Sequence, residues 1–91
     1  LNMREYYKTI RAHEQITMMG DEEIQVGDNI TLQISEEDSD SQEVLAFEVT
    51  EVLPEGFRVT LVDNPIEVTS IDYGDEYPEF ITHSHIIEIL D

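Results

Sequence analysis

The sequence predicts a mainly β fold, a small antiparallel barrel or sandwich of five to six strands with an N-terminal arm or short helix. Three observations support this: short segments of alternating apolar and polar residues, Gly- and Pro-containing turns between them, and no helical periodicity over residues 24–90. A chain of 91 residues, 40% of them hydrophobic, suffices for one domain with one modest core. We therefore expect residues 1–91 to form a single domain, with residues 1–12 as the arm or helix and residues 13–91 as the β body.

The first element is ambiguous between helix and strand. Four apolar side chains have the i, i+3, i+4, i+7 spacing of one helix face: Met3, Tyr6, Tyr7 and Ile10. This spacing favours a short helix over residues 3–12, with an extended arm as the alternative. Ile16 and Met18 then alternate with polar neighbours, which predicts a strand near residues 13–19.

A clear strand follows the turn signals Gly20-Asp21 and Gly27-Asp28. Three apolar side chains alternate with polar ones there and are predicted to share the inner face: Ile30, Leu32 and Ile34. The next eight residues, 36–43 (EEDSDSQE), contain five acids and no apolar side chain, so they are predicted to form a loop.

A hairpin is predicted next, from strands over residues 44–53 and 57–63 with the turn Pro54-Glu55-Gly56 between them. Alternation places six of its side chains toward the core: Leu45, Phe47, Val49, Phe57, Val59 and Leu61. A further short strand is predicted over residues 66–71 and a last one over residues 85–90. An acidic, aromatic loop, residues 72–80 (DYGDEYPEF), separates them.

One stretch has a family likeness. Residues 24–34 (IQVGDNITLQI) resemble the opening strands of SH3-like and OB-type barrels. This resemblance covers about a dozen residues. It implies a fold of that kind and brings no functional residue with it.

The charge of the chain bears on its partners. There are 22 acidic and 4 basic residues, giving a formal net charge of −18, and the basic ones are Arg4, Lys8, Arg11 and Arg58. Such a field repels nucleic acid and anionic membrane and attracts basic surfaces. We therefore expect a basic protein surface as the partner, with no direct binding to nucleic acid or membrane.

The location of the protein is also predicted. The chain has no cysteine, which excludes disulfides and thiolate chemistry and fits a reducing cytoplasm. No signal peptide and no apolar run of the ~20 residues needed to span a bilayer is visible. A cytoplasmic protein is expected.

The acids gather in the segments that connect the predicted strands, whereas the outward strand positions are mostly neutral. Tyr73 and Tyr77 lie within one such segment, and tyrosine is common at interface hot spots. The candidate partner-binding residues are Glu36, Glu37, Asp38, Asp40, Glu43, Asp72, Tyr73, Asp75, Glu76, Tyr77 and Glu79. Phe80 is expected to cap the core instead.

These features predict a non-enzymatic acidic binding protein that occupies the nucleic-acid-binding surface of a partner, as a DNA mimic or inhibitor. In charge and size the chain is similar to phage anti-restriction proteins, anti-CRISPR proteins and uracil-DNA glycosylase inhibitors, so a phage origin is part of the hypothesis. The alternatives are a small β-barrel accessory domain whose acidity only gives solubility, and a weak divalent-metal-binding domain.

The sequence was also searched for motifs of metal binding and catalysis. His83 and His85 would point to one side of an extended chain and could begin a Zn²⁺ site, but no spacing fixes a third ligand. Residues 36–43 lack the glycine and ligand order of an EF-hand, and no GxSxG or phosphate-binding loop is present. We expect no enzyme activity and no cofactor. Arg4, Lys8 and Arg11 would share one helix side and could pair with the acidic body of a second copy, giving a homodimer.

Overall fold

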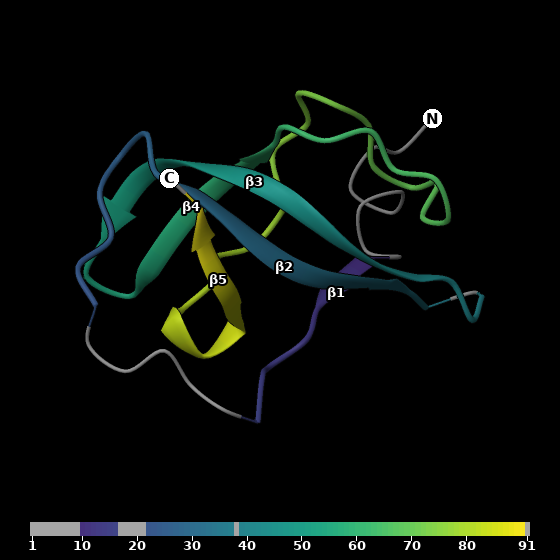
Figure 1. Ribbon diagram of the computed structural model, residues 1–91, viewed down its shortest axis with the longest axis horizontal. Helices are drawn as coiled ribbons and strands as arrows, with labels where there is room; N and C mark the ends of the chain where they lie inside the picture. Colours follow the sequence, from purple (N-terminus) through teal and green to yellow (C-terminus); the bar gives the residue numbers. More distant parts are fainter. Residues whose placement is uncertain (1–9, 17–21, 38, 91) are drawn as a thin grey trace.

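A computed structural model describes residues 10–16, 22–37 and 39–90 of the chain (Figure 1). In this part the fold is mainly β, as predicted, and its five strands form one antiparallel sheet. The strands are β1 (Ile10–Ala12), β2 (Asn29–Glu36), β3 (Gln42–Leu53), β4 (Gly56–Leu61) and β5 (Ile86–Leu90). A single 3₁₀ turn, His83–His85, leads into β5.

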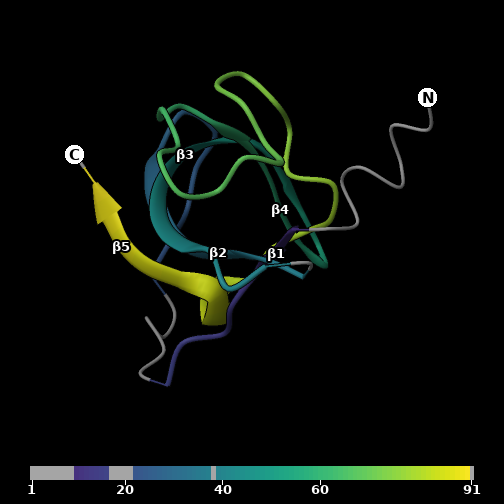
Figure 2. The same cartoon turned by 90° about the vertical axis from the view of Figure 1, so that its right-hand side faces the viewer.

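The sheet is organised around β2, which pairs with three other strands. One edge of β2 pairs with β3, and β3 pairs in turn with β4. The other edge is shared, because β5 pairs with Asn29–Leu32 and β1 pairs with Ile34–Glu36. Register shifts between β2 and β5 and between β3 and β4 add local twist. The sheet therefore curls into a half-barrel, which Figure 2 shows from the side.

The alternating segments of the sequence form the core. The predicted inward side chains of β2, β3 and β4 are all buried: Ile30, Leu32, Ile34, Leu45, Phe47, Val49, Phe57, Val59 and Leu61. Side chains from irregular or terminal parts of the chain complete the same cluster: Ile10, Ala12, Ile24, Val68, Ile71, Tyr77, Ile81 and Ile86. Thr31, Gln33, Thr50 and Thr60 lie outside the core, as the alternation predicts.

The open side of the half-barrel is covered by residues 74–81. These residues run along the outer edge of β4, where Phe57 and Ile81 form one β-bridge and Thr60 and Glu76 form another. The backbone N–H of Tyr77 donates to the carbonyl of Val59 at 2.9 Å. The Tyr77 hydroxyl then accepts a hydrogen bond from the backbone N–H of Ala12 in β1, also at 2.9 Å. Tyr77 thus connects β4 to β1, the first and last strands in the order β1-β2-β3-β4.

The N-terminal strand differs from the prediction. Residues 13–16 are not in a strand, and β1 instead covers Ile10–Ala12, inside the predicted helix or arm. Ile10 and Ala12 face the core because β1 pairs with the end of β2. Ile16, an apolar residue on which the predicted strand depended, is fully exposed and does not contribute to the core. The rest of the predicted helix, residues 3–9, and residues 17–19 lie outside the described residues.

Two further expectations about strands and loops are wrong. Residues 66–71 do not form a strand, because the backbone N–H groups of residues 66–69 donate to the carboxylates of Glu43 and Glu36. The loop predicted over residues 36–43 is shorter than expected, since Glu36 ends β2 and Glu43 lies in β3. The hairpin is confirmed, with Leu53 paired to Gly56 and the second strand ending at Leu61.

Candidate functional site

Glu36, predicted as a partner-binding loop residue, is a buried structural carboxylate with 9% of its surface exposed. Its Oε2 accepts hydrogen bonds from the Thr69 backbone N–H at 3.2 Å, from the Thr69 hydroxyl at 3.3 Å and from the Ser70 hydroxyl. Its Oε1 accepts a hydrogen bond from the Ser39 hydroxyl at 3.3 Å. Glu36 therefore joins the β2–β3 turn to the loop that follows β4.

Glu43 has a similar structural role at the start of β3. Its carboxylate accepts the backbone N–H groups of Ile66, Glu67 and Val68 at 2.9–3.2 Å. These donors have no strand partner, so the carboxylate satisfies backbone groups that would otherwise need water. Together, Glu36 and Glu43 hold the loop of residues 62–71 against the end of β2 and β3.

The acid-base properties of both carboxylates follow from these contacts. Burial raises the pKa of Glu36, but hydrogen bonds from Ser70 and Thr69 outweigh this, and its pKa lies below the ordinary value of 4.5. Burial also raises the pKa of Glu43, and the donors from Ile66, Val68 and Glu67 likewise bring the net pKa below 4.5. The stabilisation that each ionised carboxylate provides is therefore complete above pH 4.5 and is lost as the pH falls through the lower folded-state pKa.

We expect Glu36→Gln to lower the free energy of unfolding at neutral pH by about 1–3 kcal/mol, because an amide NH₂ replaces an oxygen that accepts hydrogen bonds. The difference from the parent protein should shrink as the pH falls below the ordinary carboxyl pKa. Urea unfolding at neutral and acid pH measures both effects. Glu37→Gln, at the exposed neighbouring position, is the control and should change little. Equal stability of the two variants at neutral pH would contradict the structural role of Glu36.

The aromatic residues of the 72–80 segment differ from their expected placement. Tyr77, predicted to face a partner, is 3% exposed, and its ring contacts Phe47 edge to face, with 6.5 Å between the ring centroids. Burial raises the pKa of its hydroxyl above 10.0. Phe80, expected to cap the core, is 37% exposed, and the guanidinium of Arg58 lies 4.5 Å from its ring centroid. Tyr73 is exposed, in the position expected of a contact residue.

The predicted acidic segments do not all meet at one end of the sheet. Residues 22–28 precede the start of β2, whereas residues 37–41 follow its end, so the length of β2 separates them (Figure 1). Glu36 and Glu43, which flank the β2–β3 turn, lie instead beside residues 66–70, because their carboxylates accept hydrogen bonds from that segment. Asp72, Asp75, Glu76 and Glu79 continue from there along the segment that covers β4. The carboxylate of Asp75 accepts the backbone N–H of Asp72 at 3.0 Å within this segment.

We call the surface formed by Glu37, Asp40, Val44, Ile66 and Glu67 the acidic end. All five side chains are exposed, and Val44 and Ile66 are 56% and 83% exposed. Both apolar residues adjoin Glu43, because Val44 follows it in β3 and the N–H of Ile66 donates to its carboxylate. The acidic end thus combines apolar area with carboxylates. Asp38, predicted as a partner-binding residue of the loop over residues 36–43, is outside the described residues.

The two cations among the described residues are both paired with carboxylates. Arg11 Nη2 lies 3.5 Å from Glu37 Oε1, and Arg58 Nε lies 3.1 Å from Glu51 Oε1. Exposed pairs of this kind contribute less than about 1 kcal/mol to stability. The Arg11 pair offsets one carboxylate of the acidic end, that of Glu37, whereas the Arg58 pair joins β4 to β3 away from it.

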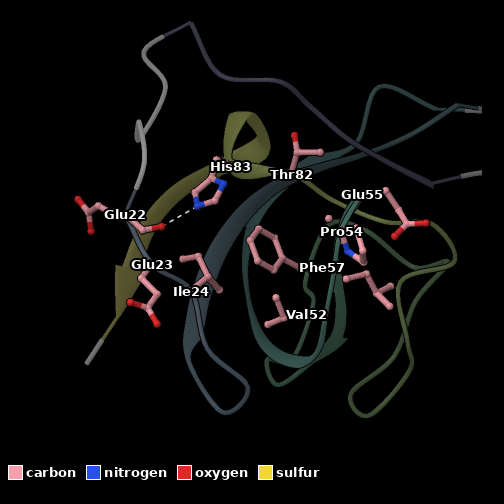
Figure 3. Close-up of a pocket in the computed structure, with 11 residues that line it drawn as sticks. Glu22, Glu23, Ile24, Val52, Pro54, Glu55, Phe57, Thr82 and His83 are labelled. Carbon is pink, nitrogen blue, oxygen red and sulfur yellow. Dashed lines mark hydrogen bonds between the residues drawn. The ribbon is translucent and has the colours of Figure 1, made fainter.

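A pocket of about 450 Å³ lies at the opposite end of the sheet from the acidic end (Figure 3). The chain before β2 forms one side, and the β3–β4 hairpin forms another. Its apolar lining includes Ile24, Val52, Pro54 and Phe57. Glu22, Glu23 and Glu55 also line it, and we call it the acid-rimmed pocket.

His83 fixes one wall of the acid-rimmed pocket. Its Nε2 donates to the backbone carbonyl of Glu22 at 2.6 Å, shown as the dashed line in Figure 3. The imidazole also packs edge to face against Phe57, with 5.2 Å between the ring centroids. The pocket is therefore built from three parts of the chain that are far apart in sequence.

The premise of the histidine metal site is wrong, because His83 and His85 lie in a 3₁₀ turn and not in an extended segment. The Nδ1 atom of His85 accepts the backbone N–H of Thr82 at 3.0 Å. Within the described ranges, no group of three or more His, Asp or Glu side chains has an arrangement that could hold a metal ion.

The acid-rimmed pocket and the inward roles of Glu36, Glu43 and Tyr77 were missed by the sequence reasoning. The available signal was the turn Pro54-Glu55-Gly56 beside an apolar strand end, but only the topology brings it to Glu22.

In residues 10–16, 22–37 and 39–90, no helix is long and apolar enough to cross a bilayer. Comparison with protein-family models, with curated proteins and with solved structures finds no match to this chain.

Proposed function

We propose that this protein is a non-enzymatic binding protein whose anionic surface occupies the basic, nucleic-acid-binding surface of a partner protein. The observation behind the proposal is the large uncompensated charge. The net charge is −18, and the described cations, Arg11 and Arg58, are each paired with a glutamate. A surface of this kind attracts basic partners over long range and accelerates their association.

The acidic end is the surface that we assign to this role. Glu36 and Glu43 hold the backbone of residues 66–69, which includes Ile66 and Glu67 of the acidic end, against the end of β2 and the start of β3. Val44 and Ile66 add exposed apolar area among the charges. Interfaces combine such apolar contact with a polar rim, and the charges then give register and association rate.

Competition with DNA tests the proposal. Basic proteins of a bacterial lysate are bound to immobilised DNA at low salt and then eluted with the protein at constant ionic strength. Polyglutamate of equal total charge is the control for general screening. We expect the protein to release a specific protein that polyglutamate leaves bound. Release of nothing beyond the polyglutamate fraction would contradict the proposal and favour an acidic domain whose charge only gives solubility.

Two sets of three neutral substitutions locate the surface. The acidic-end variant is Glu37→Gln, Asp40→Asn and Glu67→Gln, and it leaves Glu36 and Glu43 intact. The control variant, Glu14→Gln, Glu76→Gln and Glu88→Gln, removes the same number of charges at other exposed positions. We expect the acidic-end variant to lose on the order of tenfold in affinity for the released protein, because loss of rim charges slows association. Equal losses in both variants would contradict a defined surface.

A further inference from the structure

We propose that the acid-rimmed pocket binds an arginine or lysine side chain of a basic peptide segment, together with an apolar neighbour of that side chain. This inference rests on the proposed function in that the partner is a basic protein. It adds a second contact, at the other end of the sheet from the acidic end, and names the chemistry that this contact accepts.

The floor of the pocket is apolar and preformed. Ile24 and Phe57 are each 6% exposed and belong to the core, so the floor is held by the packing beneath it. Val52 is 47% exposed and stands at the side of the pocket with Pro54. A space of about 450 Å³ matches the lower range of ligand sites and can take a long side chain with part of its neighbour.

The rim has one sign of charge. Glu22, Glu23 and Glu55 are exposed around the opening, and among the described residues none that lines the pocket is Lys or Arg. Figure 3 shows the carboxylates of Glu22 and Glu23 on one side and that of Glu55 on the other. The carboxylates of Glu22 and Glu55 point outward, away from Phe57 (Figure 3), so they would attract a cation at the outer margin of the pocket rather than at its floor.

Arginine and lysine fit both parts of this arrangement. Each has an aliphatic stem that packs on apolar surface and a charged head that remains near water. The stem would contact Phe57 and Val52, and the head would lie among the rim carboxylates. Arginine can also donate two hydrogen bonds to one carboxylate. An acidic peptide is repelled by the same rim, and a wholly apolar one leaves the rim carboxylates without a counter-charge.

A peptide titration followed by ¹⁵N-resolved NMR of the full chain tests the inference. The probe is acetyl-Leu-Arg-Leu-amide, and the controls carry norleucine or glutamate in place of arginine. We expect the arginine probe to shift the amide signals of residues 22–24, 52–53, 55–57 and 82–83, and the norleucine probe to bind at least fivefold more weakly. Glu22→Gln, Glu23→Gln and Glu55→Gln together should abolish the difference between these two probes.

The other outcomes overturn the inference. Shifts that centre on the acidic end, or equal binding of the arginine and norleucine probes, would exclude a cation-selective pocket. Pocket signals that shift with protein concentration, without a probe, would identify a second copy as the occupant. The acidic-end variant should bind the probe like the parent protein, so this result does not depend on the DNA competition experiment. Loss of one activity without the other separates the two proposals.

Discussion

Gly56→Ala is expected to lower the free energy of unfolding by about 2–5 kcal/mol, from the combined cost of overpacking and of a backbone conformation that disfavours a side chain. Gly56 has φ +155° and is buried at the start of β4. A Cβ atom built there collides with the backbone carbonyl oxygen of Ile81. This oxygen accepts the N–H of Phe57 at 2.8 Å, so the collision disrupts the bridge that covers the edge of β4.

Gly74→Ala is the matched control for this experiment. Gly74 also has a positive φ, +91°, but a Cβ atom there meets no other atom within 4 Å. Its substitution should cost only the backbone strain, about 1–2 kcal/mol. Urea unfolding of both variants measures the difference. Equal losses would mean that the segment of residues 74–81 moves freely away from β4 and does not restrain it.

Tyr77→Ala is expected to cost about 3–5 kcal/mol, the range for loss of a buried aromatic ring. The ring lies against Phe47 in the core, and the hydroxyl accepts the N–H of Ala12. Because domains of this size have a total stability of about 5–15 kcal/mol, the variant can be largely unfolded. Tyr77→Phe keeps the ring and removes only the acceptor, and we expect it to cost about 1–2 kcal/mol.

Hydrogen exchange separates the two roles of Tyr77. In Tyr77→Phe, the amide of Ala12 should lose protection, whereas amides in the centre of β3 should exchange as in the parent protein. Tyr73→Phe is the control, since Tyr73 is 64% exposed and should affect neither stability nor exchange. Unchanged protection at Ala12 in Tyr77→Phe would contradict the connection between β1 and the segment that covers β4.

The central strands were predictable because their evidence is local. In β2, β3 and β4 each inward residue is apolar and its neighbours are mostly polar, so the period of the pattern gives both the strand and its buried face. The turn at Pro54-Glu55-Gly56 gave the hairpin for the same reason. These elements need no knowledge of distant parts of the chain.

The elements that failed depend on distant partners. Residues 66–71 have the composition of a strand, but Glu43, more than twenty positions earlier, takes the N–H groups that a neighbouring strand would need. Likewise, β1 has only three residues, and it is a strand because it pairs with Ile34–Glu36, the part of that edge of β2 that β5 does not occupy. No local pattern contains this information.

For the candidate site, the sequence identifies the acids and aromatic residues of the connecting segments but does not show which of them face solvent. An acid in a connecting segment looks the same in sequence whether it faces solvent, as Glu37 and Asp40 do, or accepts backbone hydrogen bonds, as Glu36 and Glu43 do. The same holds for Tyr77 and Phe80, where the expected order of burial was reversed. The difference lies in which backbone donors the fold leaves unpaired nearby.

The position of β2 between three strands also has a consequence for how the chain folds. Its contact with β3 is a local hairpin, whereas 57 positions separate Thr31 from Glu88 in the contact with β5. Closing the longer loop costs more chain entropy, and contacts distant in sequence slow folding. Until β5 docks, the backbone groups of β2 at Asn29–Leu32 are unpaired on this edge and can pair with a strand of another chain. A newly made chain in which β5 has not yet paired with β2 is therefore exposed to aggregation at this edge.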